Sequence, residues 1–324
     1  RCMADIAEEV ARYYGYNNIA TTLMRGTTTR GGYSETAMLE NQAGAAARSL
    51  GYSEIITYSF VSPASFDAVR IPKDSPLRKT LKLVNPLGED TSIMRTIILP
   101  SMLDILSRNY AMKNKGVKLY ELGRVYLPVD GQDLPEEPRH LIFGTYGEHE
   151  TFFTMKGEID ALLQLLNVKP AEYVANRENP SYHPGRCADI LIDGKLAGTI
   201  GQIHPLVAEA YGIGGEVYVA DLDFTTIEAS LAEERVFHSL PRFPAVTRDL
   251  ALVCDEAVTV GALEACITAS AGKLLRRIDL FDIYRRPGID ILNDSIDLRH
   301  IAEAGLQSQH APEDQCGFLP AERL

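Results

Sequence analysis

The chain is poor in cysteine and has no long apolar run. Its five cysteines are scattered and none forms a Cys-x-x-Cys pair, which argues against a zinc ribbon and a secreted disulfide framework. No stretch approaches the ~20 apolar residues of a membrane-spanning helix, and no signal peptide is recognisable at the start. We therefore expect a cytoplasmic protein. Because residue 1 is an arginine, we also expect a piece of a longer polypeptide.

Basic residues are outnumbered, with 32 Lys and Arg against 44 Asp and Glu and a net charge of −12. An evenly acidic surface repels nucleic acid, so any RNA contact has to be local. The hydrophobic content of 45% and the charged content of 23% are typical of a globular protein. At one domain per ~150 residues, the 324 residues predict two domains, with a fragment of a third.

Catalytic motifs are also missing. No serine or cysteine has an evident base beside it, and the glycines of 212–215 lack the Lys-Ser/Thr of a P-loop. His183 and His204 each precede a proline in turn-like sequence, so we interpret them as hydrogen-bonding residues at strand ends rather than as an acid–base pair. We predict no catalytic residue and no cofactor-binding residue in this chain.

Apolar periodicity predicts mixed α+β structure. Residues 3–14 have helical period, with Ile6, Val10 and Tyr13 on one stripe, and polar residues 18–33 follow as a linker. Many later segments read as strands, among them 54–61, 80–84 and 117–127, where Gly123 marks a bulge or a close backbone approach. Asp193-Gly194 is a strong hairpin signal. We therefore expect a largely antiparallel sheet with flanking helices.

A second boundary is expected near 226–240. Beyond it, 249–254, 259–271 and 275–284 read as strand, helix and strand, although the apolar phase of the last strand slips between Leu280 and Phe281. This is the opening of a ferredoxin-like β-α-β-β-α-β unit. From about Pro287 the pattern breaks down, and we expect 287–324 to be poorly ordered or to pack in a non-native way.

One helix face carries three acids. Asp5, Glu8 and Glu9 are spaced i, i+3, i+4, so they share a face of the helix at 3–14. Such a triplet is either a solvated helix face or a set of oxygen ligands for Mg²⁺, which usually retains waters and takes further ligands from elsewhere.

At this point seven segments, in order, resemble the β subunit of bacterial phenylalanyl-tRNA synthetase. They cover roughly residues 1–286: MADIAEEVARYYGYNNI (3–19), EIITYSF (54–60), NPLGEDTSIMRTIILPSMLDILSRN (85–109), LYELGRVYLP (119–128), YHPGRCADILIDGKLAGTIGQIHP (182–205), RFPAVTRDLALV (242–253) and LFDIYR (280–285).

The resemblance implies that Asp5, Glu8 and Glu9 bind Mg²⁺ at a site shared with the α subunit, although a further upstream aspartate of the family's set is absent here. It also implies a class II synthetase fold that has lost the groups for catalysis, with ATP bound by the α subunit. Adenylate formation needs an arginine for the α-phosphate and a second one on the adenine. Arg95 matches only the first, so we favour a structural Arg95 paired with Glu89 or Asp90.

The C-terminal segment is the nucleic-acid candidate. Its basic residues include Arg242, Arg248 and Arg285, which we take as tRNA-binding candidates, and the aromatic rings of Phe243, Phe281 and Tyr284 could stack on bases. The resemblance implies a ferredoxin-fold anticodon-binding domain, which contacts tRNA(Phe) in the family. Because its second half is not recognisable, we expect weak tRNA binding.

The sequence therefore divides into five expected parts: 1–22, the end of a Mg-binding domain; 23–33, a linker; 34–230, a pseudo-active core; 239–286, a partial anticodon-binding domain; and 287–324, a divergent tail. The resemblance implies a non-catalytic β subunit in an (αβ)₂ ligase that charges tRNA(Phe) with phenylalanine. A free-standing Mg-nucleotide-binding enzyme and an RNA-binding module are the alternatives.

Overall fold

Two units make up the chain in the computed structural model, Arg1–Glu234 and Arg235–Leu324. The structure describes residues 2–233, 235–237, 244–255, 258–272, 275–284 and 293–303. Within these residues, no helix is long and apolar enough to cross a bilayer.

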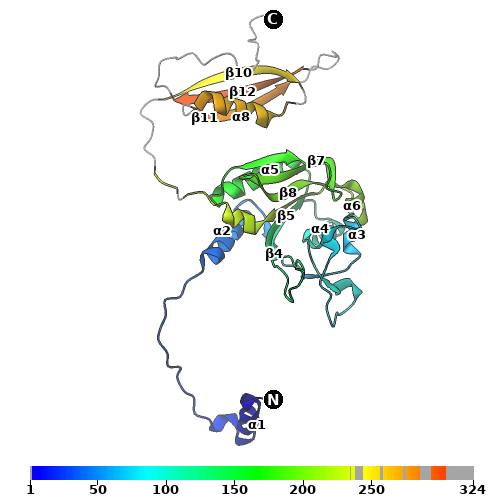
Figure 1. Ribbon diagram of the computed structural model, residues 1–324, viewed down its shortest axis with the longest axis vertical. Helices are drawn as coiled ribbons and strands as arrows, with labels where there is room; N and C mark the ends of the chain where they lie inside the picture. The colour runs from blue at the N-terminus through cyan, green and yellow to red at the C-terminus, as the bar shows by residue number, and fades with distance from the viewer. Residues whose placement is uncertain are drawn as a thin grey trace, which may run out of the picture. The chain divides into compact units, whose positions relative to one another are not determined.

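The first element is the predicted N-terminal helix, α1 (Met3–Tyr14), followed by a short 3₁₀ turn, η1 (Tyr16–Asn18). α1 ends at Gly15, whose φ of +91° suits glycine. The apolar stripe of Ile6, Val10 and Tyr13 is exposed, and no residue of α1 is buried. Residues 20–34 have no regular secondary structure (Figure 1).

A seven-stranded sheet forms the centre of the first unit. Its strand order is β1 (Ser53–Glu54), β4 (Val117–Arg124), β5 (Arg139–Tyr146), β9 (Tyr218–Asp223), β8 (Lys195–Ile203), β7 (Tyr182–Ile192) and β6 (Ala171–Ala175). Every neighbouring pair is antiparallel except β1 and β4. β7 and β8 form the predicted hairpin, since Asp193 and Gly194 both take the positive φ of a tight turn. The largely antiparallel sheet confirms the predicted α+β class.

Helices cover both faces of this sheet (Figure 1). One face packs on α2 (Glu35–Ser49), α5 (Phe152–Leu165) and α7 (Phe224–Ala229). The other packs on α3 (Ser65–Ala68), α4 (Leu99–Ala111) and α6 (Pro205–Ala210). Neighbouring strand residues divide between the two cores, as alternation along a strand requires: Tyr120 and Phe143 join the first, and Leu119 and Ile142 the second.

The predicted strand at 54–61 is interrupted. β1 ends at Glu54, and a separate β2 (Phe60–Val61) pairs with β3 (Ile93–Met94), near the turns η2 (Pro76–Arg78) and η3 (Glu89–Thr91). The run changes partners: Ile55 N–H donates to the Tyr120 carbonyl at 2.9 Å, whereas the Ser59 carbonyl accepts from Arg95 N–H at 2.9 Å. The strand predicted at 80–84 is reduced to an isolated bridge between Lys82 and Ile93.

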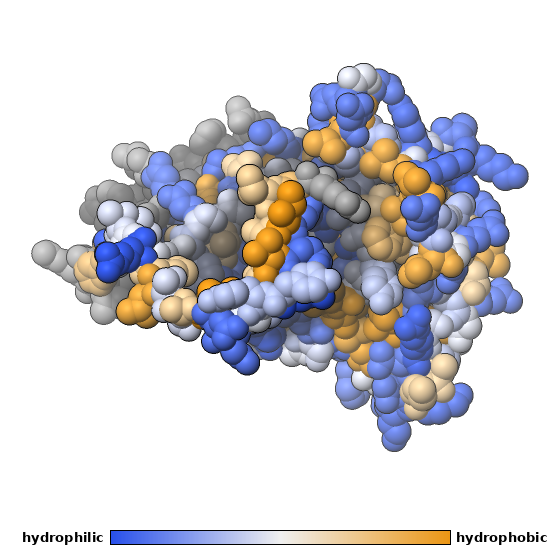
Figure 2. Space-filling view, turned by 90° about the horizontal axis from the view of Figure 1, so that it is seen from below, coloured by the Kyte–Doolittle hydropathy of each residue, from blue (hydrophilic) through white to orange (hydrophobic). Residues whose placement is uncertain are grey.

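Several apolar side chains stay on the surface of the first unit. Ile56 and Tyr58, on the interrupted segment, are 90% and 80% exposed, and Leu87 is fully exposed. Figure 2 shows orange apolar groups separated by blue hydrophilic ones on the face that it presents. Single exposed apolar residues of this kind are common on proteins and need no partner to explain them.

The second unit is a three-stranded antiparallel sheet with one helix. Its strand order is β10 (Ala245–Asp255), β12 (Asn293–Glu303) and β11 (Leu275–Tyr284), and α8 (Val260–Ala271) joins β10 to β11. Leu263 of α8 is buried against Leu252 and Ile278. The phase slip seen in the sequence is a register shift in β11 between Leu280 and Asp282.

β12 corrects one expectation. We expected 287–324 to be poorly ordered or to pack in a non-native way, which is wrong for 293–303, because β12 pairs along its whole length with β10 and also with β11. A central strand is held by backbone hydrogen bonds on both edges, so its own apolar pattern can be weak and escape recognition. Residues 304–324 lie outside the described residues.

Candidate functional site

Arg95 is the side chain on which a nucleotide-binding reading depends, and it is buried. It lies between β3 and α4, with a side-chain exposure of 2%. Its Nη2 pairs with Glu121 Oε1 at 2.9 Å, its Nη1 donates to Thr57 Oγ1 at 2.7 Å, and its Nε donates to the Arg124 carbonyl at 2.8 Å. The guanidinium is therefore enclosed by groups of this chain.

The partners of Arg95 are fixed in turn. Thr57 Oγ1 donates to Glu121 Oε2 at 2.7 Å, so both carboxylate oxygens are occupied. A Cβ on Gly123 would lie 2.3 Å from Arg95 Nη2 and 2.9 Å from Glu121 Oε1. Only glycine leaves room for the pair, which confirms the predicted close backbone approach at Gly123.

The pair decides between the two interpretations of Arg95. A guanidinium that binds a phosphate has to present N–H groups to the ligand, and here they point at Glu121, Thr57 and the backbone. A structural Arg95 agrees with the prediction, but the predicted partners were wrong. Glu89 and Asp90 lie in η3 and are exposed, whereas the actual partner comes from β4, across the fold.

A polar row continues across the same sheet face from Glu121. His140 Nδ1 lies 2.8 Å from Asp221 Oδ1. Thr199 stands opposite Asp221 in the ladder and hydrogen-bonds Asp189 at 3.1 Å. Three of the five side chains in this row are carboxylates, so the row disfavours a polyphosphate. The row could not be predicted from the sequence, because its members come from five separate strands.

His140 is the member of this row whose pKa its neighbours shift. Burial alone would lower the pKa of His140, but the negative charges of Asp221 and then Asp223 outweigh it, and the pKa of His140 is raised above its ordinary 6.5. The folded protein therefore stabilises the charged imidazole relative to an imidazole in water.

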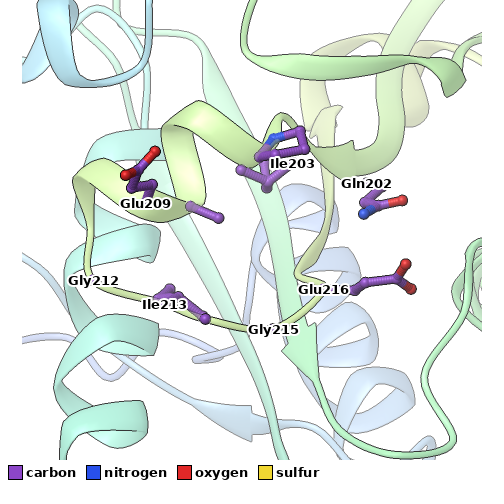
Figure 3. Close-up of a pocket in the computed structure, with 10 residues that line it drawn as sticks. Gln202, Ile203, Glu209, Gly212, Ile213, Gly215 and Glu216 are labelled. Atoms are coloured by element: carbon purple, nitrogen blue, oxygen red, sulfur yellow. The ribbon is translucent and has the colours of Figure 1, made fainter.

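A cavity of about 450 Å³ lies beside the glycine-rich loop 212–215. Ile203, Ile213 and Ala208 supply apolar walls, with Glu209 on α6 and Glu216 after the loop (Figure 3). Neither Lys nor Arg is among the residues that line this cavity. A phosphate-binding loop has a lysine that reaches the phosphates, and the lining of this cavity has none.

The three predicted magnesium ligands lie on α1 but are not drawn together. Asp5 accepts from the Cys2 N–H at 2.8 Å as part of the helix cap, and Glu9 pairs with Arg12 at 2.6 Å. Within the described residues, no group of three His, Cys, Asp or Glu side chains could hold a metal ion. The residues present therefore do not make a closed site by themselves.

The two flagged histidines are local hydrogen-bond acceptors, as predicted. His183 Nδ1 accepts from the Gly185 N–H, and His204 Nδ1 accepts from the Leu206 N–H as the N-cap of α6, each at 3.1 Å.

Of the tRNA-binding candidates, Arg248 is exposed on β10, and Arg242 and Arg285 lie outside the described residues. Phe243 also lies outside them. Phe281 is 51% exposed at the register shift of β11.

Comparison with known proteins gives consistent results for both units. Residues 19–224 match the phenylalanyl tRNA synthetase beta chain CLM domain, and residues 241–304 match the ferredoxin-fold anticodon binding domain. The latter match includes β12, which supports the correction above.

Relatives named phenylalanine--tRNA ligase beta subunit occur in Clostridium tetani, with 42% identity, and in Clostridium acetobutylicum, with 39% identity, each over 282 residues. Each alignment covers 87% of this chain and 36% of the relative, so the chain spans about a third of the relatives' length. A crystal structure of pyrrolysyl-tRNA synthetase from Desulfitobacterium hafniense matches 60% of this chain and 68% of its own, with a TM-score of 0.50 and 14% identity, which shows a shared fold alone.

Removing one member of the buried pair should destabilise the first unit strongly. Glu121→Gln leaves the Arg95 charge buried without its counter-ion, and we expect a loss of about 3–5 kcal/mol in the free energy of unfolding in urea. The double variant Arg95→Met/Glu121→Leu should recover most of that loss. Arg124→Met, which removes an exposed pair with Glu137, is the control and should cost under about 1 kcal/mol. Equal effects for Glu121→Gln and the control would contradict the buried pair.

The His140–Asp221 pair should make stability depend on pH. Because the folded pKa of His140 is raised above 6.5, its contribution is fully present below about pH 6.5 and is lost as the pH rises through the folded pKa. The difference in unfolding free energy between wild type and His140→Gln should therefore shrink between pH 5.5 and pH 8.5. A difference that stays constant or grows would show that the pair is not an ion pair in solution.

Proposed function

Because the chain belongs to the phenylalanyl-tRNA synthetase beta chain family, we propose that it is a non-catalytic part of a ligase that joins phenylalanine to tRNA(Phe) at the expense of ATP. The observation that carries this proposal is the enclosure of Arg95 by Glu121, Thr57 and the backbone. An arginine whose N–H groups are directed at groups of its own chain cannot present them to an α-phosphate.

The core then acts as a scaffold for a second subunit. Relatives are named beta subunits, which supports an alpha-subunit partner, and we propose an (αβ)₂ assembly in which the alpha subunit binds ATP and phenylalanine. An assembly of this kind works in the cytoplasm. A free-standing nucleotide-binding enzyme would need an accessible Arg95 and a second cation near it, and the polar row next to the pair carries Asp189 and Asp221 instead.

The C-terminal unit is proposed to bind the anticodon region of tRNA(Phe). Its match to the ferredoxin-fold anticodon binding domain supports this role. Arg248 lies exposed on β10, where a cation can approach a phosphate. We propose Arg242 and Arg285 as further contacts on the resemblance alone.

α1 is proposed to supply part of a Mg²⁺ site. Asp5, Glu8 and Glu9 share one exposed helix face, and carboxylate oxygens are the ligands that Mg²⁺ prefers. Because Asp5 and Glu9 already have partners within α1, the site would need further ligands from the alpha subunit to compete for them.

Replacement of a subunit segment tests the main proposal. We would exchange the matching third of the Clostridium tetani beta subunit for this chain, co-express the chimaera with the C. tetani alpha subunit, and measure assembly size and charging of tRNA(Phe). We expect an assembled, active ligase. Arg95→Met/Glu121→Leu in the chimaera should also be active, since Arg95 does not touch the nucleotide. Loss of charging by a folded, assembled double variant would contradict the scaffold role.

Neutralising the α1 acids tests the metal proposal. Asp5→Asn/Glu8→Gln/Glu9→Gln should raise the Mg²⁺ concentration needed for half-maximal assembly severalfold, because it removes ligand charge but keeps an amide cap at position 5. A matched control neutralises three exposed acids elsewhere, Glu172, Glu178 and Glu233. If both triple variants assemble like wild type at every Mg²⁺ concentration, α1 is not part of a metal site.

A further inference from the structure

Three basic side chains lie near one another at one corner of the first unit, since the charges of Arg70 and His183 both act on His204. Arg70 follows α3, His183 stands near the start of β7, and His204 caps α6. We call this set the basic corner. Arg70 is exposed, and the two histidines are half-buried.

Backbone and side-chain contacts hold the corner together. Ser181 is buried, and its Oγ donates to the Val69 carbonyl at 2.6 Å. The Ser181 carbonyl accepts from the His204 N–H at 2.9 Å. Arg70 Nη1 donates to the Pro180 carbonyl at 3.2 Å. Three segments that are distant in sequence are thus fixed around one buried serine.

Each imidazole keeps one ring nitrogen as a donor. His183 Nδ1 and His204 Nδ1 each accept a backbone N–H, so in the neutral ring the proton is on Nε2. Within the described residues, no group accepts from either Nε2. Arg70 keeps further guanidinium N–H groups beyond the one that it gives to Pro180.

None of the three side chains of the corner has an ion-pair partner within the described residues. Glu216 lies near His183, but its carboxylate is held by Arg186 at 2.8 Å and by the Tyr218 hydroxyl at 2.6 Å. Burial, and then the positive charges of Arg70 and His183, lower the pKa of His204. The acid that acts on His183 is thus already paired with other groups.

We propose that the basic corner binds a backbone phosphate of the tRNA, an inference that rests on the proposed function. A guanidinium and two imidazole N–H donors on neighbouring segments suit the oxygens of a tetrahedral anion. A phosphate contact of this kind positions a nucleic acid without reading its sequence, and it satisfies the condition that RNA contacts on this acidic protein be local.

The backbone at Arg70 provides an unusually clean test. Arg70 has a φ of +61°, and the Ile71 N–H donates to the Phe66 carbonyl at 2.9 Å, which is the end of a helix where glycine is preferred. Arg70→Gly therefore removes the cation and relaxes the backbone together. Lys113, after α4, has a φ of +64° and the same arrangement, with the Asn114 N–H on the Asn109 carbonyl. Lys113→Gly is the matched control.

The experiment measures binding of a tRNA(Phe) transcript to the full chain by filter binding at several KCl concentrations, with thermal unfolding in parallel. We expect Arg70→Gly to weaken binding about three- to tenfold and to reduce the salt slope by about one, with an unfolding midpoint no lower than that of wild type. His183→Asn and His204→Asn keep the backbone acceptor but lose the Nε2 donor, and each should also weaken binding. Lys113→Gly should bind like wild type.

Binding by Arg70→Gly that equals wild type and Lys113→Gly would overturn the proposal, as would wild type without measurable tRNA affinity. A titration with inorganic phosphate, followed through the imidazole NMR signals, tests whether the corner binds a small free anion instead. If phosphate shifts the imidazole signals while the variants bind tRNA like wild type, the corner binds a small anion and the tRNA contact is rejected. Charging by the chimaera reports on the proposed function separately, since it does not require this corner.

Discussion

The buried pair of Arg95 and Glu121 is the constraint on which the rest of the core depends. It joins the segment before α4 to the central sheet, and it needs both Thr57 and the bare backbone of Gly123 to fit. A buried charge is tolerated only when it is paired and fully hydrogen-bonded. The Arg95 guanidinium meets that requirement by donating to groups of the protein, so it is unavailable to a ligand.

On the sheet face beside the pair, polar side chains are likewise hydrogen-bonded to other groups of the protein. His140 is hydrogen-bonded to Asp221, and Asp189 accepts hydrogen bonds from Thr199 and Asn176. Polar groups satisfied within the protein keep a surface ordered but leave little affinity for a ligand. The basic corner of Arg70, His183 and His204 is different, because within the described residues no carboxylate pairs with Arg70 and no group accepts from either Nε2.

Much of the fold could be predicted from local pattern. Helical period gave α1, the Asp193-Gly194 turn gave the β7–β8 hairpin, and a phase slip at Leu280 marked a real irregularity in β11. Features that depend on distant partners could not be predicted in this way. The partner of Arg95 comes from another strand, and β12 is held by its two neighbours rather than by a strong pattern of its own.

Because Arg95 is enclosed, we expect the synthetase-like core to bind no nucleotide. Isothermal titration of ATP with Mg²⁺ into the chain tests this most directly. The enclosure of Arg95 predicts no saturable heat. Saturable binding at one site per chain, abolished in the folded Arg95→Met/Glu121→Leu variant, would contradict the account, because it would mean that the guanidinium leaves Glu121 to hold the nucleotide.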